Sequence, residues 1–223
     1  MARESSKRFV LIVAVFAALL IGSAGLLFAK NNQTQAHPKN AAAPIDFRAA
    51  KTIGSKSAPI LLEDFSDFQC PSCRLFFLTT IQQVIKNYVS TNKVYIVHHD
   101  FPLEMHAHSM EAARWANAAA EIGKFQEVET ALYSTQDKWE VTGRIEDVVA
   151  PVLTAAELKR VQTLMAKPEV QAAIDQDVAL GKQRNINETP SIFVTHNGEM
   201  NQIPTRGASY GILKQYFDYL LSH

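Results

Sequence analysis

Residues 64–73 have the sequence DFSDFQCPSC, and this stretch contains both cysteines of the 223-residue chain, Cys70 and Cys73. Any disulfide within the chain must therefore join these two residues. A disulfide across so short a loop constrains the unfolded chain little, so it would add little stability. A CxxC pair beside a β-α-β pattern is instead typical of redox proteins. We therefore expect the pair to have a chemical role.

The residues around this pair predict a β-α-β unit. Residues 59–65 form a short apolar run that is typical of a buried strand, and residues 94–98 form another. Between them, apolar residues recur at helical spacing from Pro71 to about Tyr88. Strands joined in this way run parallel, with a right-handed crossover. Cys70 is then expected at the start of the helix, because a proline such as Pro71 is tolerated in the first turn.

A cysteine at a helix N-terminus is expected to be reactive. The unpaired N–H groups and the helix dipole favour a negatively charged sulfur, so the pKa of Cys70 should be lowered. Cys73 would lie one turn further along, where it is positioned to attack a mixed disulfide formed at Cys70. Cys70 is therefore the expected nucleophile, and Cys73 the expected resolving cysteine.

Two other interpretations of the pair stay open. It could be a local disulfide without turnover, or it could contribute to a zinc site, which needs about four ligands. The histidines that could help to bind zinc are His98, His99, His106 and His108. His106 or His108 could instead lie near Cys70 and lower its pKa. The redox interpretation is favoured, and we expect neither a metal nor a cofactor.

The chain after this unit predicts a helical block, a hairpin and a last helix. Residues from about 105 to 185 are rich in Ala, Leu, Glu, Lys and Gln, which favour helices. Residues 191–195 and 199–203 flank an Asn-Gly pair that is typical of a hairpin turn. Residues 209–222 have the pattern of an amphipathic helix.

Thr189 and Pro190 stand immediately before the first hairpin strand. A proline cannot donate a hydrogen bond to a neighbouring strand, so it is tolerated at the first strand position. A cis bond at such a point is a deliberate feature. We expect Thr189 and Pro190 to lie beside the cysteines, where a backbone edge could pair with a substrate chain.

Asp64 lies six residues before Cys70, at the end of the first predicted strand. A carboxyl group buried under the cysteine pair would have a raised pKa and could accept or return the Cys73 proton. Because strand residues alternate between two faces, we expect only one of Asp64 and its neighbour Glu63 to point inward. Asp64 is the favoured residue.

The first 29 residues predict a membrane or export segment. Arg3, Lys7 and Arg8 precede an uncharged run from Phe9 to Ala29. As a helix this run would span about 31 Å, close to the thickness of a bilayer's hydrocarbon core. A secretory signal usually has a shorter apolar core. An uncleaved anchor is therefore favoured over a cleaved signal peptide, with the N-terminus in the cytoplasm.

Residues 30–45 are polar and aperiodic, and they predict a flexible linker. The folded domain is expected over residues 46–223. The formal net charge of the chain is zero, and the part beyond residue 30 has 18 basic and 21 acidic residues without a basic run. This balance gives no reason to expect a nucleic-acid partner.

The chain resembles the DsbA-like branch of the thioredoxin superfamily over about residues 46–222. The resemblance rests first on the stretch 64–73. The other matching segments are Asp100–Leu103, His106, Gly123–Phe125 in the Ala-rich region, and Thr189–Ser191. It implies an α/β thioredoxin fold with a mixed central sheet and an inserted helical domain at about 105–185. It also implies a nucleophilic Cys70, a resolving Cys73, and a cis Pro190 preceded by Thr189.

The chain departs from the family pattern at three places. It has Asp64 where members usually carry Glu, and Glu188 where Gly is common before the Thr-Pro pair. The dipeptide Pro71-Ser72 differs from the Pro-His of the strongest oxidants. The departures bear on proton relay and on the reduction potential.

The resemblance implies a thiol–disulfide oxidoreductase of the bacterial cell envelope, anchored in the inner membrane with its catalytic domain in the periplasm or extracytoplasmic space. The favoured activity is oxidation of thiols in exported proteins. Re-oxidation would come from a quinone-linked membrane partner of the DsbB or VKOR-like kind. The alternatives are a disulfide isomerase or reductase, and a non-catalytic chaperone or metal-binding module. Residues 30–45 are too short and polar for the dimerisation domain of related isomerases, and we expect a monomer.

Overall fold

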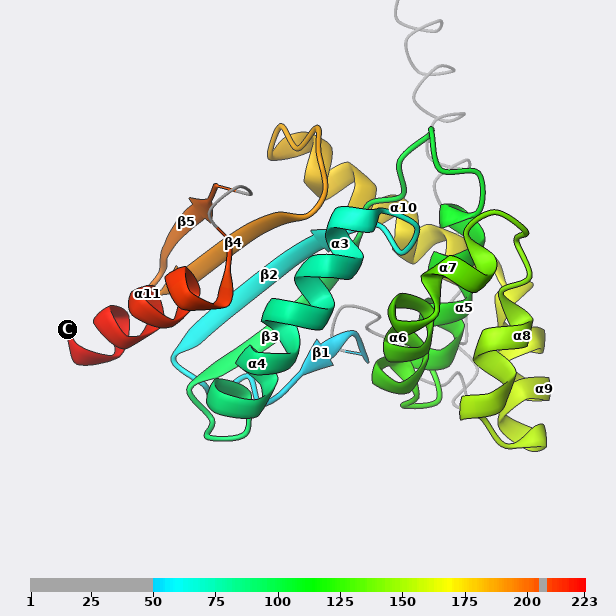
Figure 1. The fold of residues 1–223 in the computed structure, drawn as a ribbon, viewed down its shortest axis with the longest axis horizontal. Coiled ribbons are helices and arrows are strands. Elements are labelled where there is room, and N and C mark those ends of the chain that lie inside the picture. The colour runs from blue at the N-terminus through cyan, green and yellow to red at the C-terminus, as the bar shows by residue number, and fades with distance from the viewer. Residues whose placement is uncertain (1–49, 205–207) are drawn as a thin grey trace, which may run out of the picture. The chain divides into compact units, whose positions relative to one another are not determined.

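Strand β2 (Ile60–Ser66) lies at the centre of a mixed five-stranded sheet. In the computed structural model, which describes residues 50–204 and 208–223, the strand order is β1-β3-β2-β4-β5 (Figure 1). The other strands are β1 (Thr52–Ile53), β3 (Val94–Asp100), β4 (Ser191–His196) and β5 (Glu199–Ile203). β2 and β3 are parallel, whereas the other neighbouring strands are antiparallel.

A long helical run begins at Pro71, shortly after the end of β2. Its segments are α3 (Pro71–Phe76), η1 (Phe77–Ile81), α4 (Gln82–Val84) and η2 (Ile85–Val89). The segments η1 and η2 are π-helical, and the run continues through them without a break. The predicted β-α-β unit is thus confirmed, as are the hairpin of β4 and β5 and the closing helix α11 (Tyr210–Ser222).

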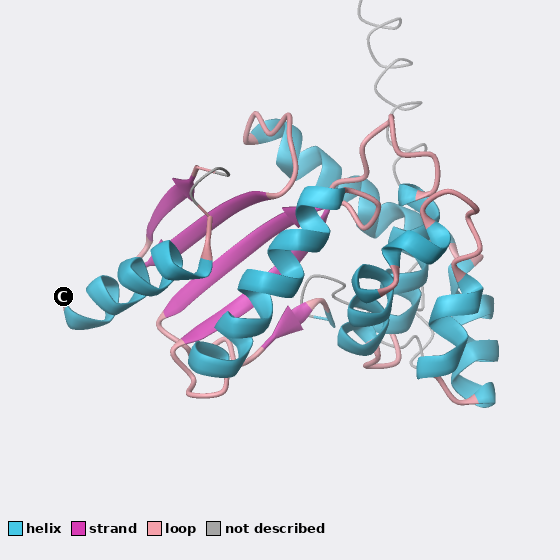
Figure 2. Ribbon diagram, viewed as in Figure 1, coloured by secondary structure: helices cyan, strands magenta, loops and turns pink. Residues whose placement is uncertain are grey.

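The helical block follows β3, and its helices are joined by short loops (Figure 2). The members of the block are α5 (Ser109–Ala120), α6 (Phe125–Ser134), α7 (Gln136–Trp139), α8 (Glu146–Val149), the 3-10 turn η3 (Ala150–Val152), α9 (Ala155–Met165) and α10 (Pro168–Gln183). Helix α5 packs against α6, α9 and α10. Helix α10 also packs against β3, so it covers the sheet as well as the block.

The side chains of β2 alternate between two buried layers. Leu62 belongs to the larger core, which also contains side chains of α3, η1 and α11. Phe65 points to the other face, where it packs with Phe101 and Phe193. Helix α10 closes this second face, because Gly181 lies directly against the rings of Phe101 and Phe65. Figure 1 shows the two helical layers in front of and behind the sheet.

The expectation that only one of Glu63 and Asp64 lies inside is wrong. Glu63 is 7% exposed and Asp64 is 5% exposed. Alternation along the strand holds, and the two side chains point to opposite faces. Both are buried because β2 is a central strand with helices over each face, as is common for parallel sheets. The two-residue strand β1 has too little sequence to produce a recognisable pattern, and it was not predicted.

The predicted anchor at residues 1–29 and the linker at residues 30–45 lie outside the described residues. The described residues belong to one compact unit, Ile45–His223. Within this part of the chain, none of the helices combines the length and the hydropathy that crossing a membrane requires.

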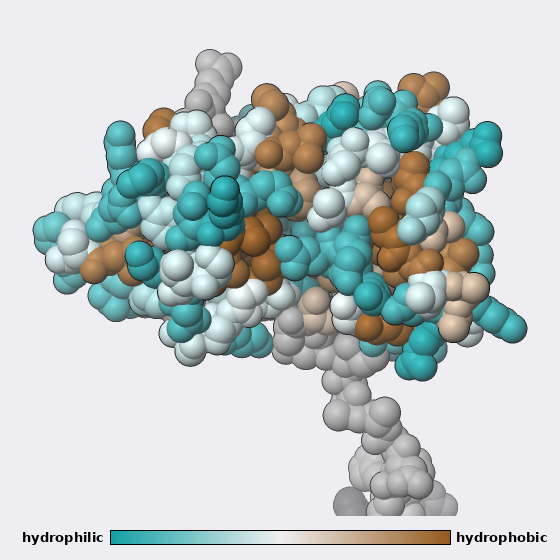
Figure 3. All heavy atoms as spheres, turned by 60° about the horizontal axis from the view of Figure 1, so that its bottom comes forward, coloured by the Kyte–Doolittle hydropathy of each residue, from teal (hydrophilic) through white to brown (hydrophobic). Residues whose placement is uncertain are grey.

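Apolar side chains occur in separate groups on one face of this unit (Figure 3). On the face in Figure 3, hydrophobic atoms form several clusters with hydrophilic side chains between them. The most exposed large apolar residues are Val141, Met105 and Leu75, at 82%, 81% and 63%.

Candidate redox site

Cys70 occupies the N-cap position of α3, where the chain changes from extended to helical. Its backbone angles are φ −75° and ψ 123°, and Pro71 takes the first helical position. The N–H of Cys70 donates to the carbonyl of Asp67 over 3.1 Å, and its own carbonyl accepts from Arg74 over 3.1 Å. Cys70 is 7% exposed and Cys73 is 1% exposed, and both are free thiols. An incoming sulfur therefore reaches Cys70 more easily.

The surroundings of Cys70 favour its thiolate. A hydrogen bond from the Cys73 thiol is the largest cause, and Thr189 and the backbone N–H groups of Ser72 and Cys73 add to it. These interactions outweigh burial and lower the pKa of Cys70 to about 5. At neutral pH, Cys70 is therefore a nucleophilic thiolate.

Cys73 has the opposite character. Burial raises its pKa well above the ordinary value, and the hydrogen bond to Cys70 and the charge of Asp64 raise it further. The N–H of Asp67 donates to the Cys73 sulfur over 3.5 Å. Cys73 stays protonated at neutral pH, so it needs a proton acceptor before it can attack a disulfide.

Thr189 and Pro190 lie beside the cysteines. The peptide bond between them is cis, and the sulfur of Cys70 is 3.5 Å from the carbonyl oxygen of Thr189. Strand β4 begins at Ser191, which is opposite Phe65 of β2 in the antiparallel pairing. This pairing places the residues before β4 next to the residues that follow β2.

Asp64 lies on the same face of β2 as the core that contains Cys73. Its carboxylate accepts a hydrogen bond from the hydroxyl of Ser66 over 2.7 Å. Burial raises the pKa of Asp64 to about 6, against the opposing effects of His98 and Ser66. A carboxyl group with this pKa can accept or release a proton near neutral pH. Its charge acts on Cys73 in turn.

Glu63 serves another cluster, on the opposite face. It accepts two hydrogen bonds from Arg184, over 3.1 and 3.2 Å, and its Oε1 is 3.0 Å from Nε2 of His99. Burial raises the pKa of Glu63, but hydrogen bonds from His99 and Arg184 more than offset it, so the pKa is lowered. Glu63 is therefore an ionised structural group and not a partner of the cysteines.

Asp67 organises the backbone around the cysteines, and the sequence did not single it out. Its carboxylate accepts from the N–H groups of Gln69 and Leu103 over 2.7 and 2.8 Å. It also binds Nδ1 of His106 at 2.7 Å and the hydroxyl of Ser109. One carboxylate thus joins the loop that leads from β2 to Cys70 to the residues that follow β3. Asp67 lies within residues 64–73, but its partners Leu103, His106 and Ser109 come from 36 to 42 residues further along.

Two glutamines complete the frame around Cys70. The side chain of Gln69 accepts from the N–H of His108 and donates to the carbonyl of Glu140, each over 2.7 Å. Gln136 donates to the carbonyls of Phe68 and Cys70 over 2.7 and 3.2 Å. The helical block therefore holds the start of α3 in place.

The histidines considered for a zinc site are dispersed. His98 and His99 point to opposite faces of β3, and His106 pairs with Asp67. Within residues 50–204 and 208–223, no three side chains of His, Cys, Asp or Glu are placed to hold a metal ion together.

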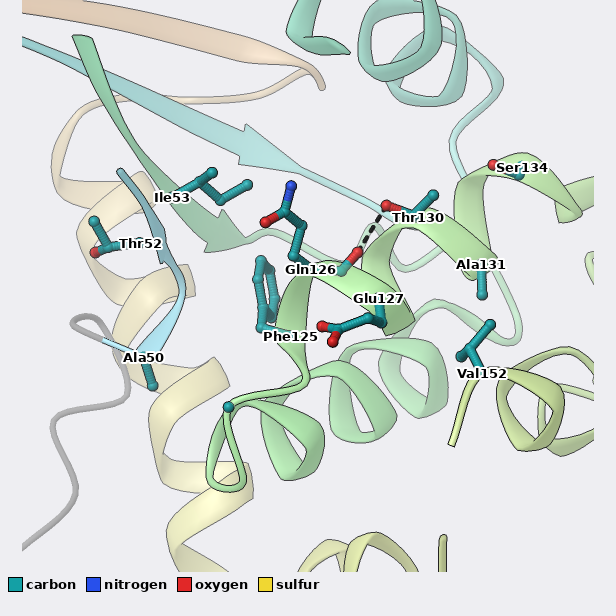
Figure 4. A pocket seen from close by; sticks show the side chains of 11 residues that line it. Ala50, Thr52, Ile53, Phe125, Gln126, Glu127, Thr130, Ala131, Ser134 and Val152 are labelled. Atoms are coloured by element: carbon teal, nitrogen blue, oxygen red, sulfur yellow. Dashed lines mark hydrogen bonds between the residues drawn. The ribbon is translucent and has the colours of Figure 1, made fainter. Parts of the chain in front are cut away.

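An open hollow of about 800 Å³ lies between β1 and α6, away from the cysteines. Ile53, Phe125 and Val152 supply its apolar lining, and Gln126 and Glu127 are among its polar residues (Figure 4). None of residues 64–73 or 189–190 lines it. It is therefore separate from the redox site.

Comparisons with known proteins agree with this geometry. A family model described as thioredoxin matches residues 48–205. The Na(+)/H(+) antiporter NhaA 1 of Mycobacterium sp. (strain KMS) is 29% identical over 167 residues, which are 74% of this chain and 26% of that protein. The chain thus spans about a quarter of that relative's length.

Two further matches cover most of both chains. The probable disulfide bond formation protein D of Bacillus anthracis is 19% identical over 156 residues, which are 68% of this chain and 72% of that protein. The crystal structure of α-DsbA1 from Wolbachia pipientis has a TM-score of 0.62 at 18% identity, over 77% of this chain and 90% of that one. This likeness shows a shared DsbA-like fold.

Proposed function

The chain belongs to the thioredoxin family, and from this premise we propose that it is an extracytoplasmic thiol–disulfide oxidoreductase that donates the Cys70–Cys73 disulfide to thiols of exported proteins. The observation that carries the proposal is the division of roles between the cysteines. Cys70 is the more exposed of the two and is ionised, whereas Cys73 is almost completely buried and protonated.

The proposed reaction begins with the oxidised pair. A substrate thiolate attacks the sulfur of Cys70, the Cys70–Cys73 bond breaks, and Cys73 leaves as a thiolate that takes the proton of Asp64. A second substrate thiolate then attacks the substrate sulfur of the mixed disulfide, and Cys70 leaves as a thiolate. The substrate gains a disulfide, and the cysteine pair is reduced by two electrons.

The low pKa of Cys70 supports the oxidising direction. A thiol with a pKa of about 5 in place of 9 stabilises the reduced protein at pH 7 by about 3 kcal/mol. For a two-electron couple this corresponds to about 60 mV, in the direction that makes the disulfide a stronger oxidant. The leaving tendency of Cys70 rises for the same reason.

Exposed apolar residues near Cys70 support a polypeptide substrate. Met105 lies between two residues that bind Asp67, which are Leu103 and His106. Val141 directly follows Glu140, whose carbonyl accepts a hydrogen bond from Gln69. Met105 and Val141 are 81% and 82% exposed. Apolar side chains held on segments next to the nucleophile would bind unfolded chains without selecting one sequence.

The proposal extends to the compartment and the redox partner. An N-terminal anchor would hold the domain, as a monomer, on the outer side of the inner membrane. A reduced Cys70–Cys73 pair must pass two electrons to another protein before the next cycle, and a quinone-linked membrane protein of the DsbB or VKOR-like kind is the proposed acceptor.

The deciding test is the reduction potential of the protein in equilibrium with glutathione, together with oxidation of a dithiol peptide. We expect a potential several tens of millivolts above the thioredoxin value of about −270 mV, and rapid peptide oxidation. A potential at or below that value would assign the chain to the reductases instead. Loss of peptide oxidation in Cys70→Ser, together with retained folding, distinguishes a thiol catalyst from a chaperone module.

A further inference from the structure

His98 is held in a fixed position beside Asp64. The two residues are opposite each other in the parallel pairing of β2 and β3, so their side chains share one face of the sheet. The imidazole is 2% exposed. It stacks on Phe68 with ring centroids 5.0 Å apart, and Phe125 packs against it at 5.3 Å.

Two carboxylates hold this imidazole as a cation. Nδ1 of His98 is 3.2 Å from Oε1 of Glu129, and Nε2 is 3.5 Å from Oδ1 of Asp100. Burial would lower the pKa of His98, but Asp100 and Glu129 raise it to about 10. His98 is therefore an imidazolium at neutral pH, although it is buried.

The other charged groups around this pair are accounted for. Asp100 also forms an ion pair with Lys51, and Lys51 forms a second ion pair with Asp177. In addition, Asp100 accepts a hydrogen bond from the side chain of Asn117 in α5 over 2.7 Å. His99 points to the opposite face, where it binds Asp177 and Glu63.

Helices α6 and α3 contribute the remaining titratable groups. Burial raises the pKa of Tyr133 well above its usual value, so this residue of α6 stays neutral. Cys73 faces Asp64 from α3 and is likewise protonated. Among the described residues, His98 is the cation with the largest effect on Asp64, and Glu129 is the anion that opposes it.

We propose that His98 is a positioning residue that acts through Asp64: as the counter-ion clamped between Glu129 and Asp100, it sets how much of Asp64 is ionised and ready to take the Cys73 proton. The inference rests on the proposed thiol–disulfide function. The inference extends that function, because the ionisation of Asp64 then depends on charged side chains of β3 and α6.

The central experiment titrates the Asp64 carboxyl carbon by NMR in the full chain, with its signal assigned through Asp64→Asn. In His98→Gln, loss of the cation leaves Asp64 with the anions Glu129 and Asp100, and we expect its titration to move up by about one pH unit or more. Simple loosening of the core would expose Asp64 and move its titration down, towards an ordinary carboxyl. A downward or unchanged midpoint in His98→Gln would therefore overturn the proposal.

A second variant predicts the opposite sign. Glu129→Gln removes the anion that raises the pKa of Asp64, while Asp100 still keeps His98 charged. We expect the Asp64 titration to move down in Glu129→Gln. His196→Gln is the matched control, because this histidine lies at the far end of β4 and binds only the carbonyl of Pro59 and its neighbour Asn197. It should leave the Asp64 titration unchanged.

Two further readouts keep the test decisive. If His98→Gln fails to fold, the imidazole of His98 is titrated in the unchanged protein. We expect it to stay protonated beyond pH 8, and a midpoint near 6.5 would overturn the proposal. Peptide oxidation by the unchanged protein is measured alongside. If it is absent, the proposed function fails whatever the titrations show, and if it is present, the titrations alone decide the role of His98.

Discussion

The sulfur of Cys70 lies 3.5 Å from the carbonyl oxygen of Thr189, although 119 residues separate the two in the chain. The contact exists because β4 pairs with β2, which brings the residue before Pro190 to the start of α3. The backbone carbonyl of Thr189 therefore forms part of the immediate surroundings of the Cys70 sulfur.

The reactivity of Cys70 should follow a titration with a midpoint near pH 5. Because the thiolate is the reactive form, alkylation of the reduced protein by iodoacetamide should be fast above this pH and fall as the pH drops through it. In Cys73→Ala the main stabilising hydrogen bond is lost, so the midpoint should rise. The rate is measured between pH 3 and 9, and the same midpoint in both proteins would refute the role of the Cys73 thiol.

Asp64→Asn should stabilise the protein at high pH while it slows the reaction. The folded protein raises the pKa of Asp64 from 3.8 to about 6. The stability that this raised pKa contributes is therefore fully present below pH 3.8 and is lost as the pH rises through 6. The free energy of unfolding changes by about 3 kcal/mol between these two limits. Guanidinium unfolding should show the variant more stable by up to this amount at pH 8, with little difference at pH 3.5.

Asp64→Asn should also slow the transfer of the Cys73 proton. Without the acceptor, attack by Cys73 on a mixed disulfide should slow by about 100-fold near pH 7, the lower end of the effect of a general base. Asp147→Asn is a suitable control, because Asp147 is exposed and pairs only with Arg144. An unchanged resolving rate in Asp64→Asn would assign the proton to another group.

Arg184→Met should destabilise the fold without altering the cysteines. It leaves the buried carboxylate of Glu63 with His99 as its remaining partner. Removal of one member of a buried ion pair costs about 3 kcal/mol, and we expect a loss of about 2–3 kcal/mol because Arg184 is partly exposed. Guanidinium unfolding at pH 7 measures the loss. The Cys70 titration should stay near 5, because Glu63 and Asp64 lie on opposite faces of β2, and a shift would contradict this separation.

Replacement of Met105 and Val141 by Ser should weaken the reaction with unfolded proteins. Loss of two apolar contacts of about 1 kcal/mol each predicts a KM increase of about 30-fold for a reduced unfolded protein. The reaction with glutathione should not change, since it needs only Cys70. Val152→Ser is the matched control, because Val152 is exposed but lines the separate hollow. An equal loss of activity with the unfolded protein and with glutathione would indicate damage to the redox site.

Local sequence was enough to predict the central elements. The β-α-β unit around Cys70, the hairpin at 191–203 and the closing helix all depend on apolar periodicity and on turn residues within short windows. The position of Cys70 at a helix start follows from the same local pattern, because Pro71 fits the first turn.

The burial of Glu63 depends on a segment that is distant in the sequence. The alternation of β2 places Glu63 and Asp64 on opposite faces, but it does not tell which faces are covered. Helix α10 buries Glu63 against Arg184, from a segment 121 residues away. Three of the partners of Asp67, which are Leu103, His106 and Ser109, likewise lie 36 to 42 residues from it in the chain.

The sequence by itself thus determined the order of the elements that follow β1, the helix-start cysteine pair and the proline before β4. Only the tertiary structure decided which groups control that pair. Burial of Asp64, the charge on His98 and the approach of Thr189 to Cys70 depend on groups from β2, β3, β4 and α6 that meet in one core. Electrostatic interactions act across space and strengthen as water is excluded, so a local pattern in the chain cannot specify them.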